Sequence, residues 1–171
     1  YDIKEFLKKS RKEFAEKEIK LPGILIVDTP GHAAFMNLRR RGGAVADIAI
    51  LVIDVTAGTM PITWESVRIL RERKTPFVIA ANKIDRISGW KTRGDIKQSI
   101  ESQAINTNTN FQEKFYKIVA ALESHGFKSD FFYKVKDFTQ KIAIVPCSAE
   151  TKEGLPELLM VLCGLSQKFL S

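Results

Sequence analysis

The sequence predicts an α/β domain with a mostly parallel sheet and helices on both faces. Four short runs are apolar throughout rather than alternating, as is typical of strands buried on both faces, and amphipathic stretches separate them. With 171 residues, of which 44% are hydrophobic, the chain is long enough to bury one core. The predicted strands are residues 24–28, 48–55, 77–82 and 142–148.

Helices in the first half are predicted from amphipathic spacing and from residues that begin or end a helix. Residues 1–20 carry many Lys and Glu with apolar residues on one side, which fits either a solvated surface helix or a helix that contacts a partner. Residues 33–41 are expected to form a short basic helix that the following glycine pair can end. Residues 61–73 form the next predicted helix, which Pro61 can begin.

The second half holds one polar stretch and two predicted helices. Residues 87–110 are polar with scattered Gly and Asn, which indicates an insertion or long loop with room for one helical turn. Residues 111–125 place Phe111, Phe115, Ile118 and Leu122 at helical spacing. The last helix is expected to open at Gly154-Leu155-Pro156 and to run to about Leu170.

Two polar motifs at strand ends predict a guanine-binding site. Asn82-Lys83-Ile84-Asp85 directly follows the third apolar run. The Asp85 carboxylate can accept hydrogen bonds from guanine N1–H and the exocyclic amine, a donor pair that adenine lacks. Asn82 can bond to the base edge and tie neighbouring loops together, while the Lys83 stem can lie across the base plane. Ser148, after the fourth run, can hold a tight turn whose N–H groups point at guanine O6.

The motif Asp28-Thr29-Pro30-Gly31-His32 predicts the phosphate side of the same site, because it follows the first apolar run. Asp28 can hold a Mg²⁺-bound water near the phosphates, and the Gly31 N–H can approach a terminal phosphate oxygen. His32 can orient the attacking water. Loops at the carboxyl ends of parallel strands share one rim, so these motifs are expected to converge on GTP or GDP with Mg²⁺.

The three motifs in this order resemble those of the translational GTPases. The runs LPGILIVDTPGHAAFMNLRRRGGAVADIAILVIDVTAGTMPITWESV and TPFVIAANKIDRISGW are similar to the subunit-joining initiation factors of archaea and eukaryotes, the counterparts of bacterial initiation factor two. This resemblance implies a P-loop NTPase-like GTPase domain. It also implies a ribosome-dependent enzyme that hydrolyses GTP to GDP and phosphate and promotes joining of the ribosomal subunits. An elongation-type translational GTPase is the alternative, against which the Gly89-Trp90 pair speaks by resemblance.

The resemblance also assigns roles and partners. It makes His32 catalytic and Asp28 the magnesium-side acid, acting through water. Thr29, Pro30 and Gly31 lie on the phosphate side, and the guanine-binding residues are Asn82, Lys83, Asp85, Ser148 and Ala149, the last two through their backbones. The implied partners are the large ribosomal subunit and its RNA in the cytoplasm, and, through domains not in this chain, other initiation factors and initiator tRNA. The arginines at 39–41 fit either a solvated basic face or a contact with ribosomal RNA.

The phosphate-gripping loop Gly-x-x-x-x-Gly-Lys-Ser/Thr is missing, since no Gly-Lys pair occurs in the chain. The resemblance places that loop on an upstream strand, between the strand that ends at Asp28 and the strand that ends near Asp54. The predicted organisation is an amphipathic segment at 1–20 and, at 21–171, the C-terminal two-thirds of a GTP-binding domain that is incomplete at its N-terminus. Alone, the chain is expected to be unstable, because strand edges are exposed in mid-sheet, and inactive in hydrolysis. A guanine-nucleotide-binding fragment without hydrolysis is therefore the second reading.

Composition adds weaker indications. The net charge of +7 suits a partner rich in RNA, because Lys and Arg neutralise phosphates. No apolar run is long enough to cross a membrane and no signal peptide is visible, so a cytosolic protein without a membrane partner is expected. Cys147 and Cys163 form neither a metal signature nor a disulfide framework, and are expected to be small apolar fillers.

Overall fold

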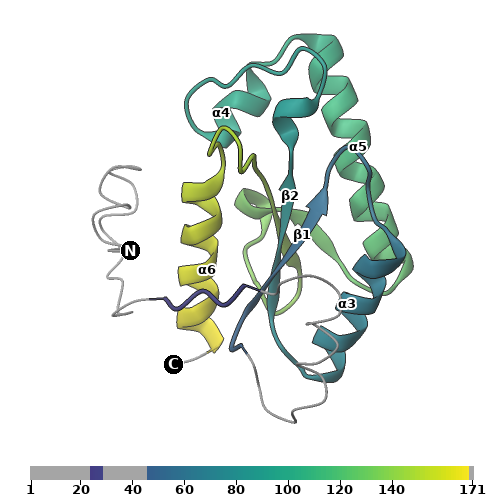
Figure 1. Ribbon diagram of the computed structural model, residues 1–171, viewed down its shortest axis with the longest axis vertical. Helices are drawn as coiled ribbons and strands as arrows, with labels where there is room; N and C mark the ends of the chain where they lie inside the picture. The colour runs from purple at the N-terminus through teal and green to yellow at the C-terminus, as the bar shows by residue number, and fades with distance from the viewer. Residues whose placement is uncertain (1–23, 29–45, 170–171) are drawn as a thin grey trace.

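One parallel sheet forms the centre of the protein, as seen in a computed structural model that describes residues 24–28 and 46–169 (Figure 1). The strand order is β1-β2-β4-β3, and all three neighbouring pairs are parallel. The predicted fold class is thereby confirmed. The strands are β1 (Ala49–Asp54), β2 (Phe77–Asn82), β3 (Ser129–Phe131) and β4 (Ile142–Pro146).

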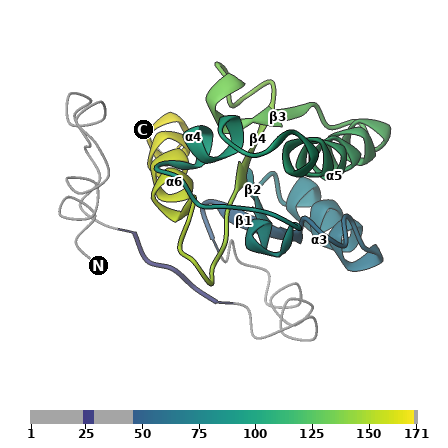
Figure 2. The same ribbon diagram turned by 90° about the horizontal axis from the view of Figure 1, so that it is seen from above.

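Helices lie on both faces of this sheet, with α3 and α5 on one face and α6 on the other (Figure 2). Pro61 begins α3, as predicted, because the missing proline N–H costs nothing in the first helical turn. The first turns of α4 and α6 meet where the Glu157 carboxylate accepts a hydrogen bond from the Ile96 N–H. The helices are α3 (Pro61–Glu72), α4 (Ile96–Glu101), α5 (Ile105–Ser124) and α6 (Leu155–Phe169), with 3-10 turns η1 (Ile84–Arg86) and η2 (Phe132–Lys134).

The core lies on both faces of the sheet, and two of its largest buried side chains come from α5. Residues 78–81 of the central strand β2 are all buried, which explains why that run is apolar without alternation. Phe111 and Phe115 of α5 are fully buried, and the Phe115 ring stacks on Phe131 of β3 with centroids 3.7 Å apart. Cys147 and Cys163 are both buried and unpaired, in agreement with their predicted role as apolar fillers.

The polar stretch at 87–110 contains more helix than predicted. It holds α4, and α5 begins at Ile105 rather than Phe111, so the prediction of a long loop is wrong for its second half. The sequence INTNTN is polar, but its side chains bond back to the preceding loop. The Thr107 hydroxyl donates to the Ser88 carbonyl at 3.2 Å, and the Asn108 amide donates to the Ile100 carbonyl at 3.3 Å. Strand β3 was also not predicted, because three residues carry no periodicity.

The predicted strand at 24–28 does not form. These residues pair with no strand, and Leu25, Ile26 and Val27 are 89%, 67% and 55% exposed. A strand needs a neighbour for its backbone hydrogen bonds, and none lies beside this segment in the part of the chain described. On the edge strand β1, the side chains of Ile50 and Val52 are also exposed, whereas Leu51 and Ile53 on the opposite face are buried.

Two predicted helices, at 1–20 and 33–41, lie outside the described residues. The arginines at 39–41 lie outside them as well. Within 24–28 and 46–169, no helix combines the length and the apolar character needed to cross a membrane.

Candidate functional site

The loops after β2 and β4 meet at the carboxyl end of the sheet, at the upper end of Figure 1. The Asn82 side-chain oxygen accepts a hydrogen bond from the Ala149 N–H at 3.0 Å. The backbones meet as well, because the Ile84 N–H donates to the Cys147 carbonyl at 3.3 Å. The structure thus brings together the two halves of the predicted guanine site, and Asn82 ties the loops together as expected.

Asp85 lies in the 3-10 turn η1 and is half-buried. Ile84, its neighbour, is completely buried and anchors this turn in the core. The Asp85 carboxylate has neither a hydrogen bond nor an ion pair with any residue in the described ranges. A half-buried carboxylate with open lone pairs beside an exposed backbone loop can accept two N–H groups from a planar base.

The side chain of Lys83 is held in place by a residue that the sequence reasoning missed. Its ammonium group lies 2.7 Å from the Asp54 carboxylate, at the end of β1. Burial raises the pKa of Asp54, but hydrogen bonds from Lys83 and Thr56 outweigh burial and hold this pKa well below its usual range. The backbone of Lys83 is left-handed, with φ of 69°, which turns the chain sharply at the end of β2. Asp54 therefore fixes the lysine stem at the rim.

The loop after β4 is a tight turn held by Ser148, as predicted. Ser148 is fully buried, and its hydroxyl accepts a hydrogen bond from the Thr151 N–H at 3.1 Å. Its own N–H donates to the Glu153 carbonyl at 2.9 Å. Ala149 is exposed on this turn, and its N–H donates across the rim to the Asn82 side-chain oxygen.

Gly154 closes this turn, and no other residue fits there. Its φ is +76°, and an added Cβ would fall on the Pro146 carbonyl oxygen. Gly126 has a similar φ of +84° but open space around it. We expect Gly154→Ala to lower the free energy of unfolding by at least about 3 kcal/mol, and Gly126→Ala by only about 1 kcal/mol. Urea denaturation checks this, and equal losses in the two variants would contradict the close packing of the turn.

Of the residues predicted to face the phosphates, the structure describes only Asp28. Asp28 is exposed and bonds to no residue in the described ranges. The rest of its motif, Thr29, Pro30, Gly31 and His32, lies outside those ranges. Within them no group of three His, Cys, Asp or Glu side chains could hold a metal ion. The predicted magnesium site and the catalytic role of His32 stay predictions.

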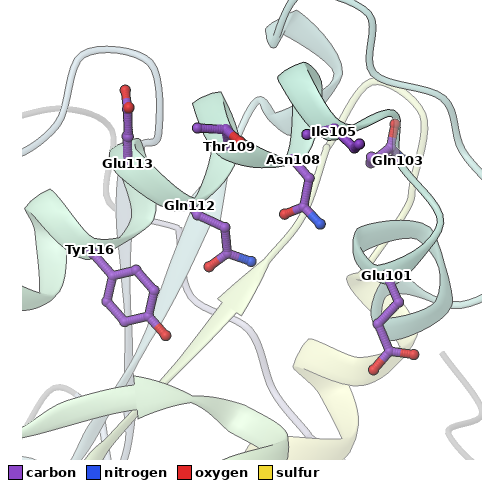
Figure 3. A pocket seen from close by; sticks show the side chains of 8 residues that line it. All are labelled: Glu101, Gln103, Ile105, Asn108, Thr109, Gln112, Glu113 and Tyr116. Carbon is purple, nitrogen blue, oxygen red and sulfur yellow. The ribbon is translucent and has the colours of Figure 1, made fainter.

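A shallow cavity of about 640 Å³ lies elsewhere, between α4 and α5 (Figure 3). Asn108, Gln112 and Tyr116 line it from α5, and Glu101 lines it from α4. None of the predicted site residues contributes to it. The candidate site is therefore an open rim of two loops, separate from this cavity.

Residues near the rim that sequence reasoning missed are Asp54, Trp90, Thr92 and Glu153. Asp54 carried a usable signal, since it is a polar residue at the end of an apolar strand, like Asn82. Glu153 carried none, because an acidic residue in a polar loop is ordinarily solvated. Here it is 6% exposed and accepts hydrogen bonds from Trp90 and Thr92.

Comparisons with known proteins agree with this geometry. Residues 9–168 match the family model described as Elongation factor Tu GTP binding domain. The chain is 54% identical over 160 residues to the probable translation initiation factor IF-2 of Methanopyrus kandleri, covering 92% of this chain and 27% of that protein. It is 52% identical over 162 residues to the corresponding protein of Staphylothermus marinus, covering 94% and 27%. The chain thus spans only about a quarter of the length of these relatives.

Solved structures give the same picture. The crystal structure of GDP-bound aIF5B from Aeropyrum pernix superposes with a TM-score of 0.86 at 46% identity, covering 96% of this chain and 28% of that chain. The apo elongation factor SelB from Methanococcus maripaludis superposes with a TM-score of 0.53 at 20% identity, covering 94% and 32%, and shows a shared fold only.

Proposed function

Because this chain belongs to the elongation factor Tu GTP-binding domain family, we propose that it forms the guanine-binding part of a GTPase of translation initiation. The complete protein would hydrolyse GTP to GDP and phosphate on the ribosome and promote subunit joining. Its initiation-factor relatives, at 52–54% identity, favour this assignment over an elongation-type GTPase. The structure of the Aeropyrum pernix relative, which is GDP-bound, supports GTP and GDP as the ligands.

The observation that carries the proposal is the pairing of an open carboxylate with a fixed loop. The Asp85 carboxylate has no partner in the described ranges, while the Asn82–Ala149 hydrogen bond fixes the loop across the rim. In this arrangement Asp85 would accept guanine N1–H and the 2-amino group. The turn held by Ser148 would offer backbone N–H groups to O6, and the Lys83 stem would cover the base plane.

The phosphates need groups that the described residues do not supply. We propose that a further segment with a Gly-rich loop adds a strand to the edge of β1 that pairs with no strand in the described ranges, where Ile50 and Val52 are exposed. The motif of Thr29, Pro30 and Gly31 would then lie against the terminal phosphate. Asp28 would hold Mg²⁺ through water, and the metal would neutralise phosphate charge.

His32 would orient the attacking water when the protein contacts the large subunit and its RNA. This contact places the protein in the cytoplasm. Other initiation factors and initiator tRNA would bind domains outside this chain. The net charge of +7 is compatible with a partner rich in RNA.

The experiment that tests this function is GTP turnover by the complete protein with and without ribosomes. We expect ribosomes to stimulate phosphate release, and His32→Ala to lower the stimulated rate about 100-fold while GDP affinity stays unchanged. His125→Ala is the matched control, because this second histidine of the chain ends α5 and stacks on Trp64. The isolated 171 residues should release no phosphate. Equal stimulated rates for wild type and His32→Ala would remove His32 from the mechanism.

A further inference from the structure

We propose that Trp90 and Thr92 are positioning residues for guanine recognition, and that they act through the buried carboxylate of Glu153 on the loop that faces O6. The inference rests on the proposed function, because it says which residues hold the Ser148–Ala149 turn in place. It assigns a purpose to the stretch after the guanine motif, which by sequence is only a polar insertion.

Two hydrogen bonds join the stretch to the turn. One Glu153 carboxylate oxygen, Oε2, accepts from the Trp90 indole N–H at 3.0 Å and from the Thr92 hydroxyl at 2.9 Å. The other oxygen, Oε1, is buried with no partner in the described ranges. A nearly buried carboxylate is costly unless its bonds are satisfied, so the position of Glu153 depends on these two donors.

Glu153 in turn holds the guanine loop through its backbone. Its carbonyl accepts the Ser148 N–H at 2.9 Å, and Ser148 directly precedes Ala149, whose N–H donates to Asn82. Gly154, next to Glu153, leaves no space for the turn to shift toward β4. A displacement of Glu153 would therefore move the N–H groups that face O6.

Trp90 and the loop that carries both donors are held in place by further contacts. The Trp90 ring packs against the fully buried Phe111, with centroids 5.3 Å apart, and the Trp90 backbone N–H donates to the Ile87 carbonyl at 2.9 Å. The Gln103 side chain bonds to both the N–H and the carbonyl of Lys91, which lies between the two donors. The stretch after η1 is thus braced against α5, and it can serve as a fixed support for the turn.

The test compares affinities of the complete protein for GDP, 6-thio-GDP and IDP, measured by calorimetry. Sulfur accepts hydrogen bonds weakly, so the preference for GDP over 6-thio-GDP reports the bonds to O6. IDP lacks the 2-amino group of guanine, so the preference for GDP over IDP reports the hydrogen bond between that group and the Asp85 carboxylate. We expect Glu153→Leu to reduce the first preference about fivefold and to leave the second unchanged.

A second variant keeps the carboxylate in place. Trp90→Phe combined with Thr92→Val retains ring packing and removes both donors, and it should lower the same preference. Glu153→Gln, made with Trp90 and Thr92 intact, should keep the wild-type preference, because one amide oxygen can accept both bonds. Thr139→Val is the control, since it removes a hydroxyl bond to Asp137 in a distant turn.

The outcomes distinguish the positioning role of Trp90 and Thr92 from the proposed binding of guanine nucleotides. An unchanged preference for GDP over 6-thio-GDP in both variants, with native circular dichroism, would overturn the inference. A parallel fall of both preferences would overturn it too, because it would indicate general loosening of the domain. Failure of the wild-type protein to bind GDP at all would instead refute the proposed function.

Discussion

Replacing Asp85 by Asn is expected to switch base preference from guanine to xanthine. In the proposed site of the wild-type protein, the open Asp85 carboxylate would accept two N–H groups of guanine. An Asn amide has one acceptor and one donor, which leaves the guanine 2-amino group facing another donor. Xanthine carries an oxygen at that position and pairs with the amide. A site strongly rejects a ligand that leaves its polar groups unpaired, and in the Asn variant this ligand is GDP rather than XDP. We therefore expect the GDP-to-XDP affinity ratio to fall by about 10⁴-fold.

Calorimetric titration of the complete protein with GDP, XDP and ADP measures this change. Asp47→Asn is the charge-matched control, because Asp47 is exposed and precedes β1, at the opposite end of the strand from the rim. The control should keep the wild-type ratio. If Asp85→Asn bound GDP and XDP in the wild-type ratio, the carboxylate would not be reading the base.

Replacing Val52 by Lys is expected to have opposite effects in the isolated chain and in the complete protein. Val52 is 60% exposed on the uncovered face of the edge strand β1. In the 171 residues alone, a lysine on this edge should raise the fraction of soluble monomer, because charge blocks edge-to-edge association. In the complete protein, the proposed further segment, which adds a strand beside β1, would also have to bury the Val52 side chain. A buried, unpaired lysine there should cost about 4 kcal/mol of unfolding free energy.

Size-exclusion chromatography measures the fraction of monomer in the isolated chain. Urea denaturation measures the loss of stability in the complete protein. Ile62→Lys is the control, since Ile62 is 43% exposed on α3, away from this face. It should be nearly neutral in the complete protein. A neutral Val52→Lys in the complete protein would show that nothing covers β1 there. A cooperative thermal transition by a monomer of the isolated wild-type chain would refute its expected instability.

Sequence patterns predicted the elements whose character is set locally. The central strands were predictable, because burial on both faces makes residues 78–81 apolar throughout, and α3 and α6 carry their own start signals. The start of α5 was not predictable, since Thr107 and Asn108 in its first turn are stabilised by bonds to the carbonyls of Ser88 and Ile100, in the segment before the helix. The segment at 24–28 has a strand-like sequence, but a strand forms only beside a neighbour.

In the site, too, some residues were predictable from local sequence and others depend on contacts between distant parts of the chain. Asn82, Asp85 and Ser148 were predictable, because polar residues at the carboxyl ends of apolar strands meet at one rim. The contribution of Glu153 was not, because its burial depends on Trp90 and Thr92, which lie about 60 residues away along the chain. A support of this kind arises only from tertiary packing.

The most direct measurement is a crystal structure of the complete protein with GDP bound. We expect the Asp85 carboxylate oxygens about 3 Å from guanine N1 and the 2-amino nitrogen, and the Ala149 N–H within hydrogen-bonding distance of O6. The single Ala149 N–H, which donates to the Asn82 side-chain oxygen at 3.0 Å, should then be shared between that oxygen and O6. A base bound away from these two loops, with the Asp85 carboxylate left in water, would contradict the account.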